Sequence, residues 1–220
     1  MTTDGSWRVV LLGLESRYAH DVIDILSSAG IGLAACIRSD HDSEVASAFP
    51  CLAPKDGLRG AALAFVVPLL TPGRRRLRVI EAVAIGLAMP PPIAHATAVV
   101  APGAALGDGA VLGAGAVIAA NVRAGQQLML NRAASVGHDC RLGDYVTIGP
   151  GATLCGGCVL EDGVYLGAGA VLCPHVVIGR NAVVGAGAVV TRDVEAGTVV
   201  AGNPARVLRR GVTGYREIGV

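Results

Sequence analysis

The chain has 220 residues and a formal net charge of +1, and only 16% of its residues are charged. This balance gives no electrostatic attraction for nucleic acid or for an anionic membrane, so we expect neither as a partner. Hydrophobic residues make up 52% of the chain, but aromatic residues only 3%, and glycine occurs 31 times. Such a composition predicts a core of small and aliphatic side chains. The apolar stretches are short or interrupted, so we expect no membrane insertion, no export signal and a cytoplasmic location.

The first 92 residues predict a small α/β domain. Strands are expected at residues 8–12, 33–37 and 62–67, and helices at 21–29 and 74–85. The alternation of strands and helices is typical of a βαβ, Rossmann-like unit. Three consecutive prolines, Pro90 to Pro92, predict a stiff boundary after this domain. The arginine run at 74–76 is interpreted as a solvated helix face rather than a phosphate clamp.

A six-residue repeat fills the rest of the chain. Bulky aliphatic side chains recur at every sixth position, with Ala124 as the exception: Val100, Leu106, Leu112, Ile118, Leu130, Val136, Leu142, Ile148, Leu154, Leu160, Leu166, Leu172, Ile178, Val184 and Val190. A period of six is neither helical nor that of a plain strand. It predicts a parallel β-helix from about Val100 to Val194, in which each coil has three short strands and three corners. Successive coils stack about 4.8 Å apart, so each residue lies above the one 18 places earlier.

Two motifs carry a resemblance to a known family. Residues 131–140 read NRAASVGHDC, with an asparagine seven places before a His–acidic pair, and residues 201–205 read AGNPA. Together with the domain order, these motifs resemble the sialic-acid O-acetyltransferase and bacillosamine or perosamine N-acetyltransferase family. The resemblance implies a left-handed β-helix, acetyl-CoA as the acyl donor and a homotrimer with sites between subunits. It divides the chain into a substrate-binding domain at 1–92, an acyltransferase domain at 93–205 and a C-terminal tail at 206–220.

The candidate catalytic group is formed by His138, Asp139 and Gly156. His138 follows a corner glycine, and a neutral imidazole is suited to take a proton from an attacking amine or hydroxyl. Asp139 is expected to orient the imidazole and stabilise its cation. Gly156 lies 18 residues after His138, so the two are expected to stack. Its backbone N–H is the candidate donor to the developing oxyanion, since a glycine lets the thioester approach.

The resemblance also suggests binding residues. For the coenzyme they are Thr147, Gly156, Ala168, Ala186, Asn203 and Pro204. For the acceptor they are Gly13, Leu14, Glu15 and Asn131. The arginines at 206, 209 and 210 are candidates for the CoA phosphates, and an exposed basic tail is the equal alternative. The acceptor implied by the family is a nucleotide-linked amino sugar. The family's glycine-rich GGGGHA loop is here replaced by GLESRYAH at residues 13–20, so the nucleotide is left open.

Other readings remain beside N-acetylation. The same base serves a hydroxyl acceptor, so O-acetylation of a sugar or small alcohol is the second candidate, and a non-catalytic scaffold is the third. A zinc-dependent carbonic anhydrase on this fold needs a His-x4-His pair, and Gly143 stands five residues after His138. The six cysteines, including the CGGC run that starts at Cys155, are expected to be small reduced side chains, with no metal. His175 is interpreted as a surface imidazole.

Overall fold

The computed structural model describes residues 8–14, 16–37, 51–52 and 63–220. The N-terminal elements are β1 (Arg8–Leu12), α1 (Ala19–Ser28), β2 (Gly32–Ile37), β3 (Cys51–Leu52), β4 (Ala64–Val66) and α2 (Pro72–Ala84). The four strands form a parallel sheet in the order β3-β2-β1-β4. Side chains alternate across β1. Val9 and Leu11 pack with α1, while Val10 and Leu12 pack with α2, so the helices cover opposite faces of the sheet. The expected α/β domain is confirmed.

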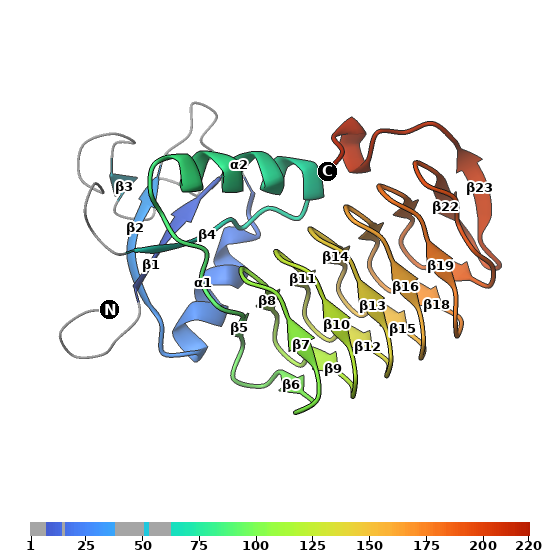
Figure 1. Cartoon of the computed structure of the whole chain (residues 1–220), viewed down its shortest axis with the longest axis horizontal. Helices are drawn as coiled ribbons and strands as arrows, with labels where there is room; N and C mark the ends of the chain where they lie inside the picture. The colour runs from blue at the N-terminus through green and yellow to red at the C-terminus, as the bar shows by residue number, and fades with distance from the viewer. Residues whose placement is uncertain (1–7, 15, 38–50, 53–62) are drawn as a thin grey trace.

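The remainder is a three-sided parallel β-helix (Figure 1). Face 1 contains β5 (Ile93–Ala94), β8 (Val111–Leu112), β11 (Met129–Leu130), β14 (Thr147–Ile148), β17 (Tyr165–Leu166), β20 (Val183–Val184), β22 (Val199–Ala201) and β23 (Arg206–Arg209). Face 2 contains β6 (Val99–Val100), β9 (Val117–Ile118), β12 (Ser135–Val136), β15 (Thr153–Leu154), β18 (Val171–Leu172) and β21 (Val189–Val190). Face 3 contains β7 (Ala105–Leu106), β10 (Arg123–Ala124), β13 (Arg141–Leu142), β16 (Val159–Leu160) and β19 (Val177–Ile178). The corners between these faces are called edges 1–2, 2–3 and 3–1.

The predicted stacking of residues 18 apart is confirmed by the strand pairing. Met129 pairs with Thr147 on face 1, and Val136 pairs with Leu154 on face 2. The aliphatic member of each hexad points inward, and the small residues four places later fill the remaining interior. Cys140 and Cys158 are such small residues and are fully buried. The register shortens only at the end, where Ile178 bridges to Val194.

The N-terminal domain packs directly on face 1. The first three strands of face 1 point the side chains of Ile93, Val111 and Met129 outward. These side chains are buried in the same apolar cluster as Val9 and Leu11 of the N-terminal domain. The two units therefore share one continuous hydrophobic contact. No helix among the described residues is long and apolar enough to cross a membrane.

Arg75 is fully buried at this contact, which corrects the interpretation of the arginine run. Its Nη1 donates to the Leu69 carbonyl at 2.7 Å and to Thr147 Oγ1 at 3.0 Å. Its Nη2 donates to the carbonyls of Tyr145 at 2.8 Å and Val146 at 3.3 Å. Burial lowers the pKa of Arg75 to about 10. Its neighbours Arg74 and Arg76 are exposed, as that interpretation expects of a helix face, but Arg75 joins α2 to face 1.

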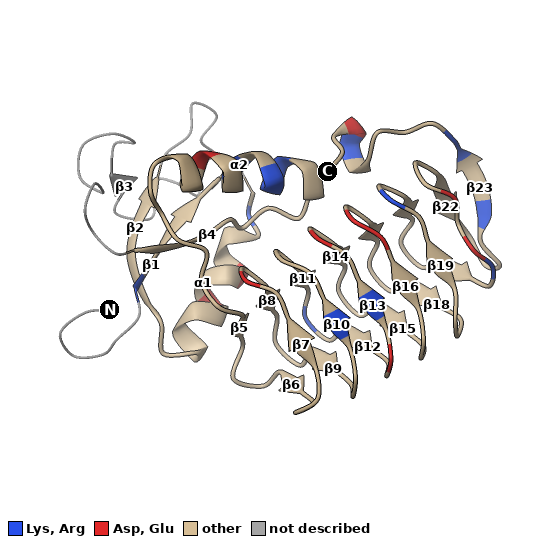
Figure 2. Cartoon of the chain, in the orientation of Figure 1, with Lys and Arg blue, Asp and Glu red and all other residues tan. Residues whose placement is uncertain are grey.

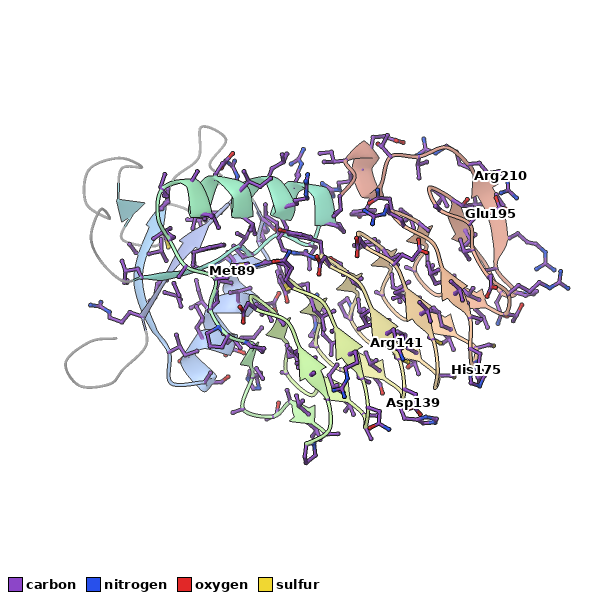
Figure 3. The ribbon with its side chains drawn as sticks, viewed as in Figure 1. Met89, Asp139, Arg141, His175, Glu195 and Arg210 are labelled. Atoms are coloured by element: carbon purple, nitrogen blue, oxygen red, sulfur yellow. The ribbon has the colours of Figure 1, made fainter. Side chains whose placement is uncertain are left out.

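The last residues are not a free tail. β23 pairs antiparallel with β22, and a short 3-10 helix, η2 (Tyr215–Glu217), follows. Figure 1 shows this red segment running back along the β-helix toward the start of α2. Two of the three arginines considered for CoA phosphates are already paired within the chain. Arg209 pairs with Glu217, and Arg210 pairs with Glu195, both of which are labelled in Figure 3.

Candidate active site

His138 and Asp139 lie on edge 2–3, in the corner that follows β12. The His138 side chain is 69% exposed, and its Nδ1 lies 2.8 Å from Asp139 Oδ2. Asn121, one coil below, donates from Nδ2 to Asp139 Oδ1 at 3.2 Å. The hydrogen bonds from His138 and then from Asn121 lower the pKa of Asp139. An ionised carboxylate only accepts hydrogen bonds, so the proton of a neutral His138 belongs on Nδ1. Its Nε2 then keeps the lone pair that a base needs.

Gly156 lies one coil above, directly against this nitrogen. A Cβ added to Gly156 would stand 2.6 Å from both Cε1 and Nε2 of His138, so the imidazole occupies the space that any side chain would fill. The Gly156 N–H has no acceptor among the described residues, because the ladder at this corner uses the N–H groups of its neighbours Cys155 and Gly157. The predicted neighbours are thus brought together, with a free donor beside the base.

We expect Gly156→Ala to lower kcat/KM by about 10²-fold, because the methyl group displaces the imidazole from its place. The measurement is CoA release at limiting acceptor. Gly103→Ala is the matched control, since it lies on the same edge and its added Cβ would meet Asn121 Oδ1 at an ordinary 3.6 Å. Equal activities of the two variants would contradict the close packing of His138 on Gly156.

His175 lies on the same edge as Asp139 (Figure 3). Its ring packs against Gly157, as the His138 ring packs against Gly156. Two imidazoles therefore flank this pair of glycines, one from the coil below and one from the coil above. His175 is an exposed side chain, as predicted, but it stands close to the candidate site.

Apart from Gly156, the residues predicted for the coenzyme are divided among three places. Ala168 and Ala186 are exposed and lie in successive coils of edge 1–2, so face 2 separates them from Gly156. Asn203 and Pro204 are exposed in the turn between β22 and β23. The expectation that Thr147 faces the coenzyme is corrected by its burial. Thr147 is completely buried beneath the N-terminal domain, where its hydroxyl donates to the Leu70 carbonyl at 2.9 Å. Its side chain is not on the outer surface of the chain.

The residues predicted for the acceptor are also dispersed. Gly13 is buried at the end of β1, with φ of 88°. The side chain of Leu14 is completely buried in the apolar core, so it is not exposed at the surface where an acceptor would bind. Glu15 lies outside the described residues. Asn131 is only 2% exposed, and its Oδ1 accepts the N–H of Arg132 at 2.8 Å.

A cavity of about 280 Å³ lies where the N-terminal domain, face 1 and the C-terminal segment meet. It is lined by Ser16, Arg17, Leu69, Leu70, Thr71, Arg74, Tyr165, Tyr215 and Arg216. The loops after β1 and β4 both open into it, as expected for neighbouring parallel strands at a switch point. Burial raises the pKa of Tyr165 to about 12. This cavity was missed in the sequence because its walls come from three distant parts of the chain.

A second cavity of about 280 Å³ lies at the C-terminal end of the β-helix, lined by residues that include Arg192, Ala205 and Arg206. Ala205 belongs to the AGNPA motif, so this cavity adjoins the turn with Asn203 and Pro204. Among the residues that the structure describes, no group of three histidine, cysteine or acidic side chains is arranged to hold a metal ion.

Two family models match parts of the chain. The model described as "Bacterial transferase hexapeptide (six repeats)" matches residues 157–192, and "Hexapeptide repeat of succinyl-transferase" matches 96–120 and 133–168. None of the curated protein sequences matches the chain.

Solved structures match almost the whole chain. A mutant of perosamine N-acetyltransferase from Caulobacter crescentus, in complex with CoA and GDP-perosamine, is 32% identical, with a TM-score of 0.84 over 91% of this chain and 96% of that one. The acetyltransferase domain of PglB from Neisseria gonorrhoeae FA1090, in complex with acetyl coenzyme A, is 29% identical, with a TM-score of 0.82 over 93% and 100%. WeeI from Acinetobacter baumannii AYE is 28% identical, with a TM-score of 0.79 over 91% and 100%.

Proposed function

The chain belongs to the hexapeptide-repeat sugar acetyltransferase family that includes perosamine N-acetyltransferase, and we propose that it acetylates the amino group of a nucleotide-linked sugar, with acetyl-CoA as donor and His138 as general base. The observation that carries the mechanism is the geometry at edge 2–3. There the Nε2 of His138, oriented by Asp139, lies against Gly156, whose N–H has no acceptor in the described part of the chain.

Direct transfer follows from these groups. The amine attacks the thioester carbonyl carbon while His138 Nε2 takes the amine proton, and the Asp139 carboxylate stabilises the resulting imidazolium. The carbonyl oxygen becomes an oxyanion that accepts a hydrogen bond from the Gly156 N–H. When the tetrahedral intermediate collapses, the C–S bond breaks and the thiolate of CoA takes the proton from His138. No acyl-enzyme is needed.

The arrangement of the edges supports a homotrimer. Edge 1–2, with Ala168 and Ala186, and edge 2–3, with His138, are on opposite sides of face 2. A donor on one edge therefore reaches the base only if edge 2–3 of a neighbouring copy stands beside it. Val99 and Val117 on face 2 are 59% and 37% exposed, and association would cover them. We therefore propose that each site combines two chains and that the trimer has three such sites.

The ends of the two substrates have separate candidate places. The cavity with Arg192 and Arg206 supports a position for the CoA phosphates next to the AGNPA turn. The cavity between the N-terminal domain and face 1 supports a position for the acceptor, and the GDP-perosamine bound by the Caulobacter relative favours a nucleotide-linked one.

The test is a CoA-release assay with a panel of acceptors. The panel contains nucleoside-diphosphate amino sugars, the same amino sugars without the nucleotide, and hydroxyl analogues of both. We expect turnover of the nucleotide-linked amines above all others. If free amino sugars react equally well, the nucleotide is not recognised. If hydroxyl analogues react best, the enzyme is an O-acetyltransferase, and if no acceptor releases CoA, the proposed function is wrong.

A further inference from the structure

We propose that the chain binds the phosphate groups of its acceptor through three arginine side chains, Arg17, Arg74 and Arg216, and that the C-terminal segment 211–220 completes this site. The inference rests on the proposed function for the identity of the acceptor. The ligand of the cavity between the N-terminal domain and face 1 is then a diphosphate ester.

The loop after β1 is poorly suited to hold a phosphate by its backbone. Phosphate loops need glycines so that several N–H groups can approach the anion closely. Here the loop begins with Gly13, which is buried, and continues with Leu14, which is part of the core. The same loop instead carries Arg17 to the wall of the cavity, with an exposed side chain.

The start of α2 adds positive charge to the opposite wall. Thr71 is its N-cap residue but makes no side-chain capping bond, and no acidic residue stands in the first turn. The N-terminus of a helix favours an anion because its N–H groups are unpaired. Arg74 lies in this first turn, and both Thr71 and Arg74 line the cavity.

The C-terminal segment is held in place on the third side. Val212 N–H donates to the Gly197 carbonyl at 2.9 Å, and Val220 N–H donates to Asn181 Oδ1 at 3.0 Å. The segment also packs on α2, because a Cβ added to Gly73 would stand 2.5 Å from the Ile218 carbonyl oxygen. Only a glycine at this position of α2 lets the backbone of the segment approach so closely. Figure 2 shows the basic residues of η2 and of the first turns of α2 at this junction.

The Arg216 guanidinium lies beside a stacked pair of aromatic rings. Tyr215 stacks on Tyr165 of β17, with ring centroids 3.7 Å apart, and the Arg216 guanidinium lies 5.7 Å from the Tyr215 centroid. None of the described residues that line the cavity carries a carboxylate, and none of the three arginines has an ion pair among the described residues. Guanidinium groups bind phosphate oxygens through paired, charge-assisted hydrogen bonds. Three of them around a cavity whose described lining has no acidic side chain favour an anion carrying more than one charge.

Calorimetry on the full-length protein, without acetyl-CoA, tests this site. The probes are GDP, UDP and pyrophosphate, with guanosine and uridine as uncharged counterparts. We expect Arg216→Gln to weaken the binding of the diphosphates by about 10-fold, as for the loss of a hydrogen bond to a charged group. Arg210→Gln is the matched control, since it removes the same charge from the same region but pairs with Glu195 away from the cavity. It should bind the diphosphates like the unaltered chain.

Coenzyme A is titrated in parallel because its own diphosphate is the other possible ligand. Arg216→Gln should leave the affinity for CoA unchanged, and a loss for CoA alone would assign the site to the donor and overturn the proposal. Equal diphosphate affinities of the Arg216 and Arg210 variants would overturn it as well. Neither of these binding results decides whether the chain transfers acetyl groups. Conversely, an absence of CoA release with every acceptor would end the proposed function while the binding data still decide the arginine site.

Discussion

Replacing His138 by alanine is expected to lower kcat/KM for acetyl transfer by about 10²–10⁴-fold, the usual contribution of a general base. The loss should lie in kcat, because the base removes a proton only as the bond to the thioester forms. The fold should survive, since the side chain is 69% exposed and its removal leaves no interior cavity. CoA release at saturating substrates, together with a thermal melt, measures both effects.

Two further variants define the role of this imidazole. Asp139→Asn keeps a side-chain oxygen that can accept a hydrogen bond from the Nδ1–H of His138 but removes the charge that stabilises the imidazolium, so we expect a smaller loss, about 10-fold. His175→Ala removes the other imidazole beside the glycine pair and should be nearly silent. If His138→Ala retains normal turnover while His175→Ala loses it, the base has been assigned to the wrong coil.

The β-helix could be predicted almost completely because its sequence rule is local and repeated. In every hexad the bulky aliphatic residue marks the position that points inward. The period of 18 residues is enough to place His138 beside Gly156. Asn121 was missed, although the same arithmetic places it one coil below Asp139. Only the hydrogen bond between the two side chains shows that Asn121 supports the carboxylate.

The contacts between the domains could not be read in this way, because they depend on how two separate units face each other. Thr147 has the same position in its hexad as exposed residues of other faces, but the N-terminal domain covers it. Leu14 reads as a loop residue, but its side chain is buried in the cluster that joins residues of the N-terminal domain to residues of face 1. A signal did exist for Arg75, which lies on the helical stripe of α2 that also contains Pro72, Val79 and Ala82, all of them buried.

Arg75→Met is therefore expected to destabilise the protein by about 2–5 kcal/mol, because each buried acceptor that loses its donor costs about 1–3 kcal/mol. Methionine fills much of the volume, so the main loss is that of the donors. The carbonyls of Leu69 and Tyr145 belong to the backbone and remain buried without this donor, which is costlier than removing both sides of a contact, whereas the Val146 carbonyl keeps its hydrogen bond from the Met129 N–H. Urea unfolding measures the change, and Arg76→Met, an exposed neighbour, should stay within about 0.5 kcal/mol.

Arg75 also positions the acceptor cavity relative to the β-helix. Its donors tie Leu69, in the cavity wall, to the strand that carries Thr147, so a variant that still folds should hold this wall less firmly. Arg75→Lys is the milder change, because one ammonium group cannot reach oxygens on two sides of the contact as a planar guanidinium does. We expect it to raise KM for the acceptor several-fold while the affinity for CoA stays unchanged. Equal increases in the KM for the acceptor and in the Kd for CoA would show that Arg75 supports only the stability of the fold, because a loss of folded protein does not distinguish the two substrates.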